Sequence, residues 1–533
     1  MSTPLFQFNR HREDIEREVT ARAVDAFSTY AGPDAIRSYQ LVLNDAAYHE
    51  INRLERARGR EAQRLDDWKN LARRIGRLSE SELADELRRR AEWYVHDVVG
   101  HFDKRVYRFA TSVLPMGLGA LFNTTDVAQG LTNMRNLASR IRVEGDVSHL
   151  RELARTGTLV FVPTHSSNLD SIVLGWSLTH SGLPPCTYGA GKNLFVNPLM
   201  GYFMRNLGAY RVDRRLRHVL YKDVLKLYSQ VLIERGYHSL FFPGGTRSRS
   251  GKIEQHLKLG LLGSALSAFT ERIARGDQRP IYIVPVTINY PLVLEAETLI
   301  EDYLKEEGRA RYIIDDDEFS RVGRIAQYSV RVMGLETSMV IRYGQPMDVF
   351  GNGVSRAGQS LAPDGSIIDA SGYLRVDGTV TSDGARDAEY TRQTGAAVAD
   401  AFLRETVILP TQFLGWLLFE RERRLAPHLD LFALLRTTSG DRHDMTELCG
   451  DAERVRQILL GLEKRGRLRL DPAIRSSPID EVIGDAVRTY SMYHLRNAVE
   501  PGDDALIVRD PKTLFFYGNR LDVWAADLRG GIA

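Results

Sequence analysis

The chain has 533 residues, more than one hydrophobic core ordinarily organises, which predicts two or three domains. Its 71 Lys and Arg residues face 69 Asp and Glu residues, and a net charge of +2 argues against a general polyanion binder. The two cysteines, Cys186 and Cys449, cannot form a disulfide framework, lack the spacing of a metal site and favour a reducing compartment.

Residues 1–138 read as a charged helical region. Arg and Glu recur at helical spacing, and there are few strand signals. The first residues, MSTPLFQFNRHREDIER, contain no apolar signal core, so export is not expected. His96 and His101 lack an accompanying carboxylate pattern, and we interpret them as structural.

Two apolar segments, 109–122 and 406–419, each lie beside a group of basic residues. Neither reaches the roughly 18 to 20 apolar residues that cross a bilayer, so no spanning helix is expected. Apolar segments with basic flanks suit a membrane surface. A pair of buried core helices has the same composition, and the sequence leaves both interpretations open.

Residues 139–350 alternate strand and helix patterns, which predicts an α/β domain with a mainly parallel to mixed sheet flanked by helices. The apolar run Thr158–Pro163 is typical of a buried strand. It leads to His165, and the next polar residues offer helix N-caps before a helix that begins near Asp170. His165 is therefore expected at the carboxyl end of a strand, where open α/β sheets place their chemistry.

Asp170 falls close enough to fold back onto the His165 imidazole. A carboxylate that holds one ring nitrogen fixes the tautomer and leaves the other nitrogen free to act as a base. A hydrogen-bonded histidine beside a helix cap would give the same spacing, so this pair alone does not identify a catalytic site.

Basic residues gather in two later stretches. Arg214 lies in RNLGAYRVDRRLR with three other arginines nearby, and guanidinium groups suit phosphate oxygens. The stretch LFFPGGTRSRSGK follows a strand, and its small residues let backbone amides approach an anion. It lacks the spacing of a Walker loop, which disfavours a nucleoside triphosphatase.

The rest of the chain contains less chemistry. VPVTINY is expected to be a buried strand in which Pro285 shapes the sheet, and 339–350 to hold the last strand of the α/β domain. Gly- and Asp-rich turns over 351–389 predict inserted hairpins. Residues 390–533 are expected to form a mostly helical C-terminal domain. Part of it resembles a winged helix, but without a basic recognition helix we expect packing against the α/β domain and no nucleic acid.

Four stretches in chain order, THSSNLD, RNLGAYRVDRRLR, LFFPGGTRSRSGK and VPVTINYPLVLEAE, resemble the glycerolipid acyltransferases. The similarity is greatest to the glycerol-3-phosphate and dihydroxyacetone-phosphate acyltransferases, whose first motif is His-x-x-x-x-Asp. It covers about residues 140–350, and the flanks match loosely. The resemblance implies the glycerolipid acyltransferase fold for this part of the chain.

The resemblance also implies roles for individual residues. His165 matches the base and Asp170 the residue that orients it. Gly244 departs from the pattern, because the family usually has Glu there, and this leaves any contact of that carboxylate with the acceptor hydroxyl in doubt. The backbone amides of Gly244, Gly245 and Thr246 are candidates to hold an oxyanion. The residues that match the phosphate-binding positions are Arg214, Arg247, Arg249 and Lys258.

The activity implied is transfer of a fatty acyl group from acyl-CoA or acyl-carrier protein to the sn-1 hydroxyl of glycerol 3-phosphate. A 1-acylglycerol 3-phosphate or dihydroxyacetone-phosphate acceptor remains open, as does a thioester hydrolase or a non-catalytic lipid-binding scaffold at the membrane. No metal or redox cofactor is expected. With such a substrate, we expect a peripheral or monotopic protein on the cytoplasmic side of the cell membrane.

Overall fold

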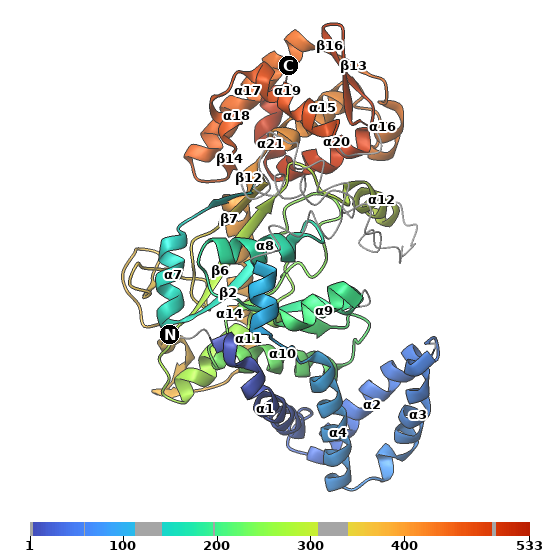
Figure 1. Cartoon of the computed structure of the whole chain (residues 1–533), viewed down its shortest axis with the longest axis vertical. Coiled ribbons are helices and arrows are strands. Elements are labelled where there is room, and N and C mark those ends of the chain that lie inside the picture. Colours follow the sequence, from blue (N-terminus) through green and yellow to red (C-terminus); the bar gives the residue numbers. More distant parts are fainter. Residues whose placement is uncertain are drawn as a thin grey trace.

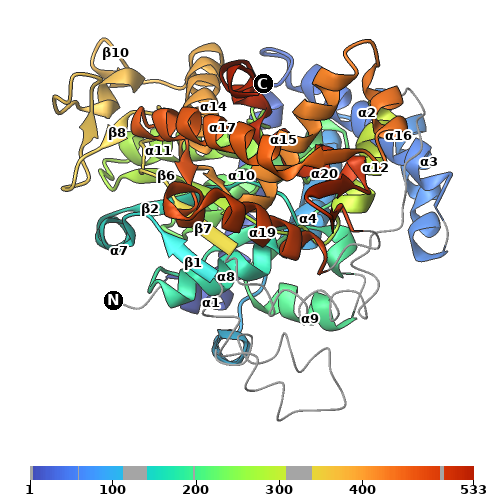
Figure 2. The same ribbon diagram turned by 90° about the horizontal axis from the view of Figure 1, so that it is seen from above.

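A computed structural model of the chain describes residues 4–57, 59–111, 141–195, 198–307, 339–492 and 497–532. Three regions follow one another along the longest axis of the molecule (Figure 1). The N-terminal helices lie at one end, the main sheet in the middle, and the C-terminal helices at the other end. The same view turned by 90° shows the C-terminal helices lying across the sheet (Figure 2).

The central sheet has seven strands in the order β1-β7-β6-β2-β5-β3-β4. Only the pair β6–β7 is antiparallel, so the predicted α/β fold with a mainly parallel, mixed sheet is confirmed. The strands are β1 (Ile141–Glu144), β2 (Thr158–Pro163), β3 (Thr187–Gly191), β4 (Ala209–Val212), β5 (Ser239–Leu240), β6 (Ile281–Asn289) and β7 (Met339–Tyr343).

Strand β2 is buried along its whole length. It lies between β5 and β6, and it pairs with β6 in parallel from Thr158 opposite Ile281 to Pro163 opposite Val286. A strand covered on both faces needs a continuous apolar run, and this is what its sequence provides. The carboxyl ends of β2, β5 and β6 therefore lie next to one another at one edge of the sheet.

The strands are connected by helices. Polar caps fix two of their starts: Asp146 accepts from the His149 amide before α7, and His218 Nδ1 accepts from the Tyr221 amide before α10. These helices are α7 (Val147–Thr156), α8 (Asp170–His180), α9 (Pro198–Asn206), α10 (Val219–Glu234), α11 (Gly260–Ala274) and α12 (Ala296–Glu307), with a short 3-10 helix η4 (Lys192–Phe195).

The N-terminal helices share one hydrophobic core with α10. The Gly100 amide donates to the Tyr228 hydroxyl at 3.1 Å, and Arg22 pairs with Glu234 at 2.7 Å. Contacts of this kind fix the helical region to the α/β region. Its elements are η1 (Pro4–Gln7), α1 (Phe8–Ser28), α2 (Ala35–Leu54), η2 (Gly59–Arg64), α3 (Leu65–Arg74), η3 (Ile75–Arg77) and α4 (Glu80–Val98).

Two short antiparallel hairpins, β8–β9 and β10–β11, follow the sheet where the turn residues predict them. They are formed by β8 (Gly353–Val354), β9 (Ser360–Leu361), β10 (Arg375–Val376) and β11 (Thr379–Val380), with η6 (Ala370–Leu374) between them.

The C-terminal region packs against the sheet. The Val293 amide after β6 donates to the Tyr517 hydroxyl at 2.8 Å, and the Thr411 hydroxyl donates to the Pro291 carbonyl. Its larger helices are α14 (Gly384–Glu405), α15 (Pro410–Leu425), α16 (Leu431–Thr437), α17 (Met445–Lys464), α19 (Ile479–Tyr490) and α20 (Pro511–Gly518). The shorter elements are β12 (Val407–Ile408), β13 (Arg442–Asp444), β14 (Arg469–Leu470), α18 (Pro472–Ser476), β15 (Val499–Gly502), β16 (Ala505–Val508), η7 (Asn519–Trp524), α21 (Ala525–Leu528) and η8 (Arg529–Gly531).

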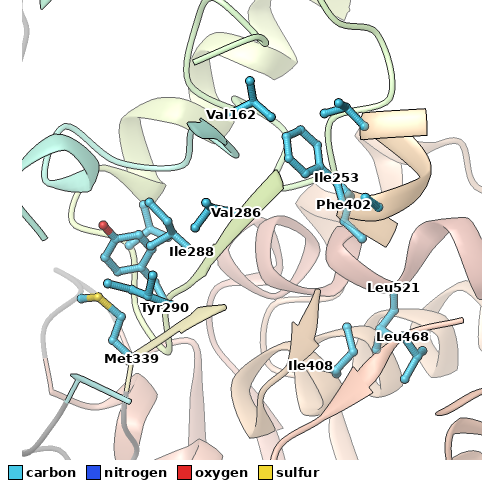
Figure 3. Close-up of a cluster of buried hydrophobic side chains, with 14 of the residues drawn as sticks. Val162, Ile253, Val286, Ile288, Tyr290, Met339, Phe402, Ile408, Leu468 and Leu521 are labelled. Carbon is cyan, nitrogen blue, oxygen red and sulfur yellow. The ribbon is translucent and has the colours of Figure 1, made fainter. Parts of the chain in front are cut away.

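The apolar segment 406–419 is part of the core. It forms β12 and most of α15, and most of its apolar side chains are buried in the same cluster as the sheet, while Val407 and Leu409 pack with Val340 of β7. Figure 3 shows Ile408 near Leu468 and Leu521, in one cluster with Val286 and Ile288 of β6. Of the two interpretations that the sequence left open, the structure selects the buried one for this segment.

The other apolar segment, 109–122, lies outside the described residues from position 112 onward. Its first residue, Phe109, is exposed and stacks on Phe203 with a centroid distance of 6.3 Å. Within the described ranges, no helix combines the length and apolar character needed to cross a membrane.

Replacement of Leu417 by Ala is expected to lower the free energy of unfolding by about 2–5 kcal/mol, because Leu417 is fully buried in α15 and the change leaves a cavity. Leu425→Ala at the exposed end of the same helix should change it by less than about 0.5 kcal/mol. Denaturant unfolding without detergent measures both. Equal stability of the two variants would contradict the core assignment.

Candidate active site

His165 and Asp170 meet at the carboxyl end of β2. The His165 Nδ1 atom lies 2.8 Å from Asp170 Oδ2, and the same oxygen accepts from the amides of Ser166 at 2.7 Å and Ser167 at 3.0 Å. The Asp170 side chain is fully buried at the start of α8. The loop between strand and helix therefore wraps around the carboxylate, as the spacing of the two residues predicts.

A tyrosine holds the other oxygen of this carboxylate. The Tyr290 hydroxyl, which follows β6, donates to Asp170 Oδ1 at 2.6 Å. Since an ionised carboxylate can only accept, the proton shared with His165 belongs on Nδ1. The imidazole is thereby left with a lone pair on Nε2, and no described residue is hydrogen-bonded to that nitrogen.

The imidazole ring is supported and partly open. It stacks on the Phe242 ring after β5, with 4.4 Å between centroids and 29° between planes. The His165 side chain keeps 14% of its surface exposed, whereas that of Asp170 keeps none. A substrate can therefore reach the ring while its carboxylate partner stays shielded from water.

Arg247 is joined to this loop through Glu295. Its Nη1 lies 3.1 Å from Glu295 Oε1, which also accepts from the Asn168 amide at 2.9 Å. The Ser167 hydroxyl donates to Glu295 Oε2 at 2.9 Å, and burial raises the pKa of Glu295. The amide of Ser248, next in sequence to Arg247, donates to the His165 carbonyl at 2.8 Å. The third and first motifs thus form one site.

Arg214 is exposed and has no ion-pair partner in the described part of the chain, but the charge of Arg247 acts on it. Desolvation, followed by the positive charge of Arg247, lowers the pKa of Arg214. Its neighbours are different: Arg211 pairs with Asp97, and Arg215 with Asp213 and Glu61. Arg214 is therefore an exposed cation with no counter-ion among the described residues, and it is close enough to Arg247 for that charge to act on it.

The remaining candidates of the third motif lie in different surroundings. Arg249 pairs with Glu306 of α12 at 2.9 Å. Lys258 lies over the turn, where a Cβ atom added to Gly245 would be 2.8 Å from its Nζ. Gly245 has a φ of +73°, and its amide already donates to the Phe242 carbonyl, whereas Thr246 is exposed. Of the three proposed oxyanion amides, that of Gly245 is therefore engaged in the turn itself.

No group of three or more His, Cys, Asp or Glu side chains is arranged to hold a metal ion within the ranges that the structure describes.

Comparison with known proteins agrees with this geometry. Residues 141–289, which contain β1 through β6 together with His165, Asp170, Arg214 and Arg247, match the family model described as Acyltransferase. This part of the chain is similar to the acyltransferase family.

The same part of the chain is similar to curated proteins named glycerol-3-phosphate acyltransferase. The one from Pseudomonas paraeruginosa is 28% identical over 255 residues, covering 48% of this chain and 27% of the relative. Those from Aeromonas hydrophila and Actinobacillus pleuropneumoniae are 32% identical over 216 and 224 residues, covering 40% and 42% of this chain and 24% of each relative. The chain thus aligns with about a quarter of the length of these relatives.

The sequence analysis did not identify four residues of the candidate active site. Tyr290 directly follows β6, whose parallel pairing with β2 could have pointed to it. Glu295 is in the fourth motif, but its partner Arg247 is far away in sequence. Phe242 and Glu254 belong to the third motif and the residues after it, and Glu254 Oε1 accepts from the His165 amide at 2.9 Å.

Protonation of Glu254 contributes to the free energy of unfolding of the α/β domain, and this contribution falls as pH rises. Burial raises its pKa from 4.5 to about 8, so the folded state keeps a proton that the unfolded state loses above pH 4.5. This contribution is complete below about pH 4.5 and is lost as pH rises through about 8. Between these values the slope is about 1.4 kcal/mol per pH unit.

In Glu254→Gln we therefore expect the thermal midpoint to fall less between pH 5 and pH 8 than in the wild type. Thermal unfolding across this range measures the difference, with the exposed Glu306→Gln as the control. If the thermal midpoints of wild type and Glu254→Gln change with pH in the same way, Glu254 has the same pKa in the folded and unfolded states.

Proposed function

We propose that the protein is an O-acyltransferase that transfers a fatty acyl group from a thioester to the sn-1 hydroxyl of glycerol 3-phosphate. The observation that carries this proposal is an oriented imidazole, His165, whose loop is joined through Glu295 to Arg247. The charge of Arg247 in turn acts on Arg214, which has no counter-ion among the described residues. The names of the related proteins support the choice of acceptor. A thioester hydrolase would need no arginine pair of this kind.

The chemistry follows from the free nitrogen of His165. Nε2 takes the proton of the acceptor hydroxyl as its oxygen attacks the thioester carbonyl. The tetrahedral intermediate then collapses, the carbon–sulfur bond breaks, and the thiolate receives the proton from the imidazolium. Asp170 stabilises the imidazolium and, held by the Tyr290 hydroxyl and two amides, keeps the ring in place. The amides of Gly244 and Thr246 are candidates to stabilise the oxyanion.

The arginines supply the acceptor site. A phosphate dianion between Arg214 and Arg247 would relieve their repulsion and accept paired hydrogen bonds from the guanidinium groups. Fixing the phosphate places the hydroxyl near Nε2, so effective molarity adds to the base catalysis. Lys258 beside the Gly245 turn adds positive charge. Arg249 would have to leave Glu306 to take part.

The donor and location belong to the same proposal. Acyl-CoA or acyl-carrier protein would supply the thioester, and no other cofactor is needed for this chemistry. Because the acyl chain and the product partition into lipid, we place the enzyme at the cytoplasmic face of the cell membrane as a peripheral protein.

The proposal is tested with purified full-length protein, palmitoyl-CoA and one of three acceptors: glycerol 3-phosphate, dihydroxyacetone phosphate or 1-acylglycerol 3-phosphate. Release of CoA thiol and formation of acylated product are followed together. We expect acceptor-dependent thiol release and the greatest kcat/KM with glycerol 3-phosphate. Thiol release that does not depend on an acceptor would indicate a hydrolase, and preference for another acceptor would replace glycerol 3-phosphate.

A further inference from the structure

The place of the missing side chain at position 244 is filled by another residue. A Cβ atom added to Gly244 would lie 2.6 Å from both Cδ and Oε2 of Glu254 and 2.8 Å from its Oε1. Two carbon–carbon bonds of about 1.5 Å put the Cβ and Cδ atoms of a glutamate about 2.5 Å apart. The carboxyl carbon of a glutamate at position 244 could therefore occupy the position of the Glu254 carboxyl carbon.

The backbone does not prevent a side chain at this position. Gly244 is absent from the glycines with positive φ, unlike its neighbour Gly245. What excludes a Cβ atom is the Glu254 carboxyl group, since all three atoms nearest to that Cβ belong to it. Gly244 and Glu254 are thus complementary: one provides the space and the other the carboxylate.

Glu254 acts on the catalytic histidine through the backbone. Its Oε1 accepts from the His165 amide at 2.9 Å, which fixes the residue at the point where β2 ends. Its Oε2 is buried and has no hydrogen-bond partner among the described residues. A buried carboxyl group with one open oxygen is costly unless a charge compensates it.

The compensating charge comes from the C-terminal region. Arg520 of η7 is 6% exposed, and its positive charge acts on both Glu254 and Asp170. Its Nε is also buried without a hydrogen-bond partner among the described residues. Arg520 lines a cavity of about 30 Å³ together with Ser166 and Tyr290, whose amide and hydroxyl donate to Asp170, and the cavity is large enough for a water molecule.

We propose that the Glu254 carboxyl group takes the place of the side chain missing at position 244 and, with the positive charge of Arg520 acting on it, positions His165 for acyl transfer. The inference rests on the proposed acyltransferase function. It makes Glu254 and Arg520 positioning residues, because they act through His165 and Asp170 and touch no substrate. It also makes the C-terminal region part of the catalytic apparatus, although the region lies outside the part that matches the family model.

The test removes the carboxyl group at position 254 and introduces one at position 244. Glu254→Ala should lower kcat at least 10-fold and change the KM for glycerol 3-phosphate less than 3-fold. Gly244→Glu alone should lower the thermal midpoint, because its Cβ meets the Glu254 carboxyl group. The double variant Gly244→Glu/Glu254→Ala should regain the midpoint and at least a third of kcat. The matched control Gly244→Leu/Glu254→Ala, similar in size but without an acceptor, should regain no activity.

The outcomes separate the two proposals. Absence of acyl transfer by the wild type refutes the proposed function, while the midpoints still test whether positions 244 and 254 share one space. If the wild type is active but Gly244→Glu/Glu254→Ala regains no more kcat than Gly244→Leu/Glu254→Ala, the role of Glu254 is overturned. If the thermal midpoint of Gly244→Glu/Glu254→Ala is as low as that of Gly244→Glu, the two carboxyl groups do not share one position.

Arg520 is tested by keeping or removing its charge. Arg520→Gln should lower kcat about 10-fold, and Arg520→Lys should retain kcat to within about 5-fold, with little change in KM. Arg529→Met, at an exposed arginine of the same region that pairs with Glu420, is the control. Wild-type kcat in a folded Arg520→Gln overturns the role of the charge, and so does a loss of more than 100-fold in a folded Arg520→Lys.

Discussion

Replacement of His165 by Ala is expected to lower kcat for acyl transfer by about 10² to 10⁴, the range that a positioned general base contributes. Nε2 is the atom that would take the hydroxyl proton, and no described residue replaces it at that point. The thermal midpoint should stay near that of the wild type, because the ring is partly exposed and Asp170 keeps its hydrogen bonds from the Tyr290 hydroxyl and two amides. Steady-state kinetics at saturating donor and acceptor measure the effect.

His180→Ala is the matched control. His180 lies at the exposed end of α8, the helix that Asp170 begins, and stacks on Trp176. It should leave kcat unchanged. If a folded His165→Ala enzyme turned over at a rate comparable to the wild type, His165 would not be the base.

The local part of the site could be read from the sequence. A continuous apolar run, a histidine, small polar caps and an aspartate in the first helical turn depend only on neighbours in the chain. The structure accordingly places β2, the loop and α8 at the residues that these patterns predict.

The partners of the site could not be read, because each comes from a distant part of the chain. Tyr290 and Glu295 follow β6, and Arg520 belongs to a region with no sequence signal for catalysis. The direction of a side chain is equally hidden: Arg249 falls in the basic third motif, yet it turns to Glu306. Tertiary packing alone decides such contacts.

Composition also fails where two environments require the same residues. The segment 406–419 is apolar enough for a membrane surface and equally suited to a core, and only its packing against the sheet shows which it occupies. At Gly244 the sequence suggests that a carboxyl group has been lost. The structure shows that the Glu254 carboxyl group lies where a side chain at position 244 would lie.

Arg214→Ala is expected to raise the KM for glycerol 3-phosphate about 10- to 100-fold with a smaller change in kcat. Hydrogen bonds to charged groups contribute about 1.5–3 kcal/mol, and a factor of ten corresponds to 1.4 kcal/mol. The KM for palmitoyl-CoA should not change. Arg217→Ala, three residues away, exposed and without an ion pair in the described ranges, serves as the control and should leave both constants unaltered.

Stability distinguishes this effect from damage to the fold. Arg214 is exposed and has no ion pair in the described ranges, so its removal should leave the thermal midpoint equal or higher. Arg214→Lys should recover only part of the affinity, since an ammonium group cannot make the paired hydrogen bonds of a guanidinium. A change confined to the KM for palmitoyl-CoA would move Arg214 to the donor side. If Arg214 binds the acceptor phosphate and does not support the fold, the acceptor KM should rise in Arg214→Ala while the thermal midpoint does not fall.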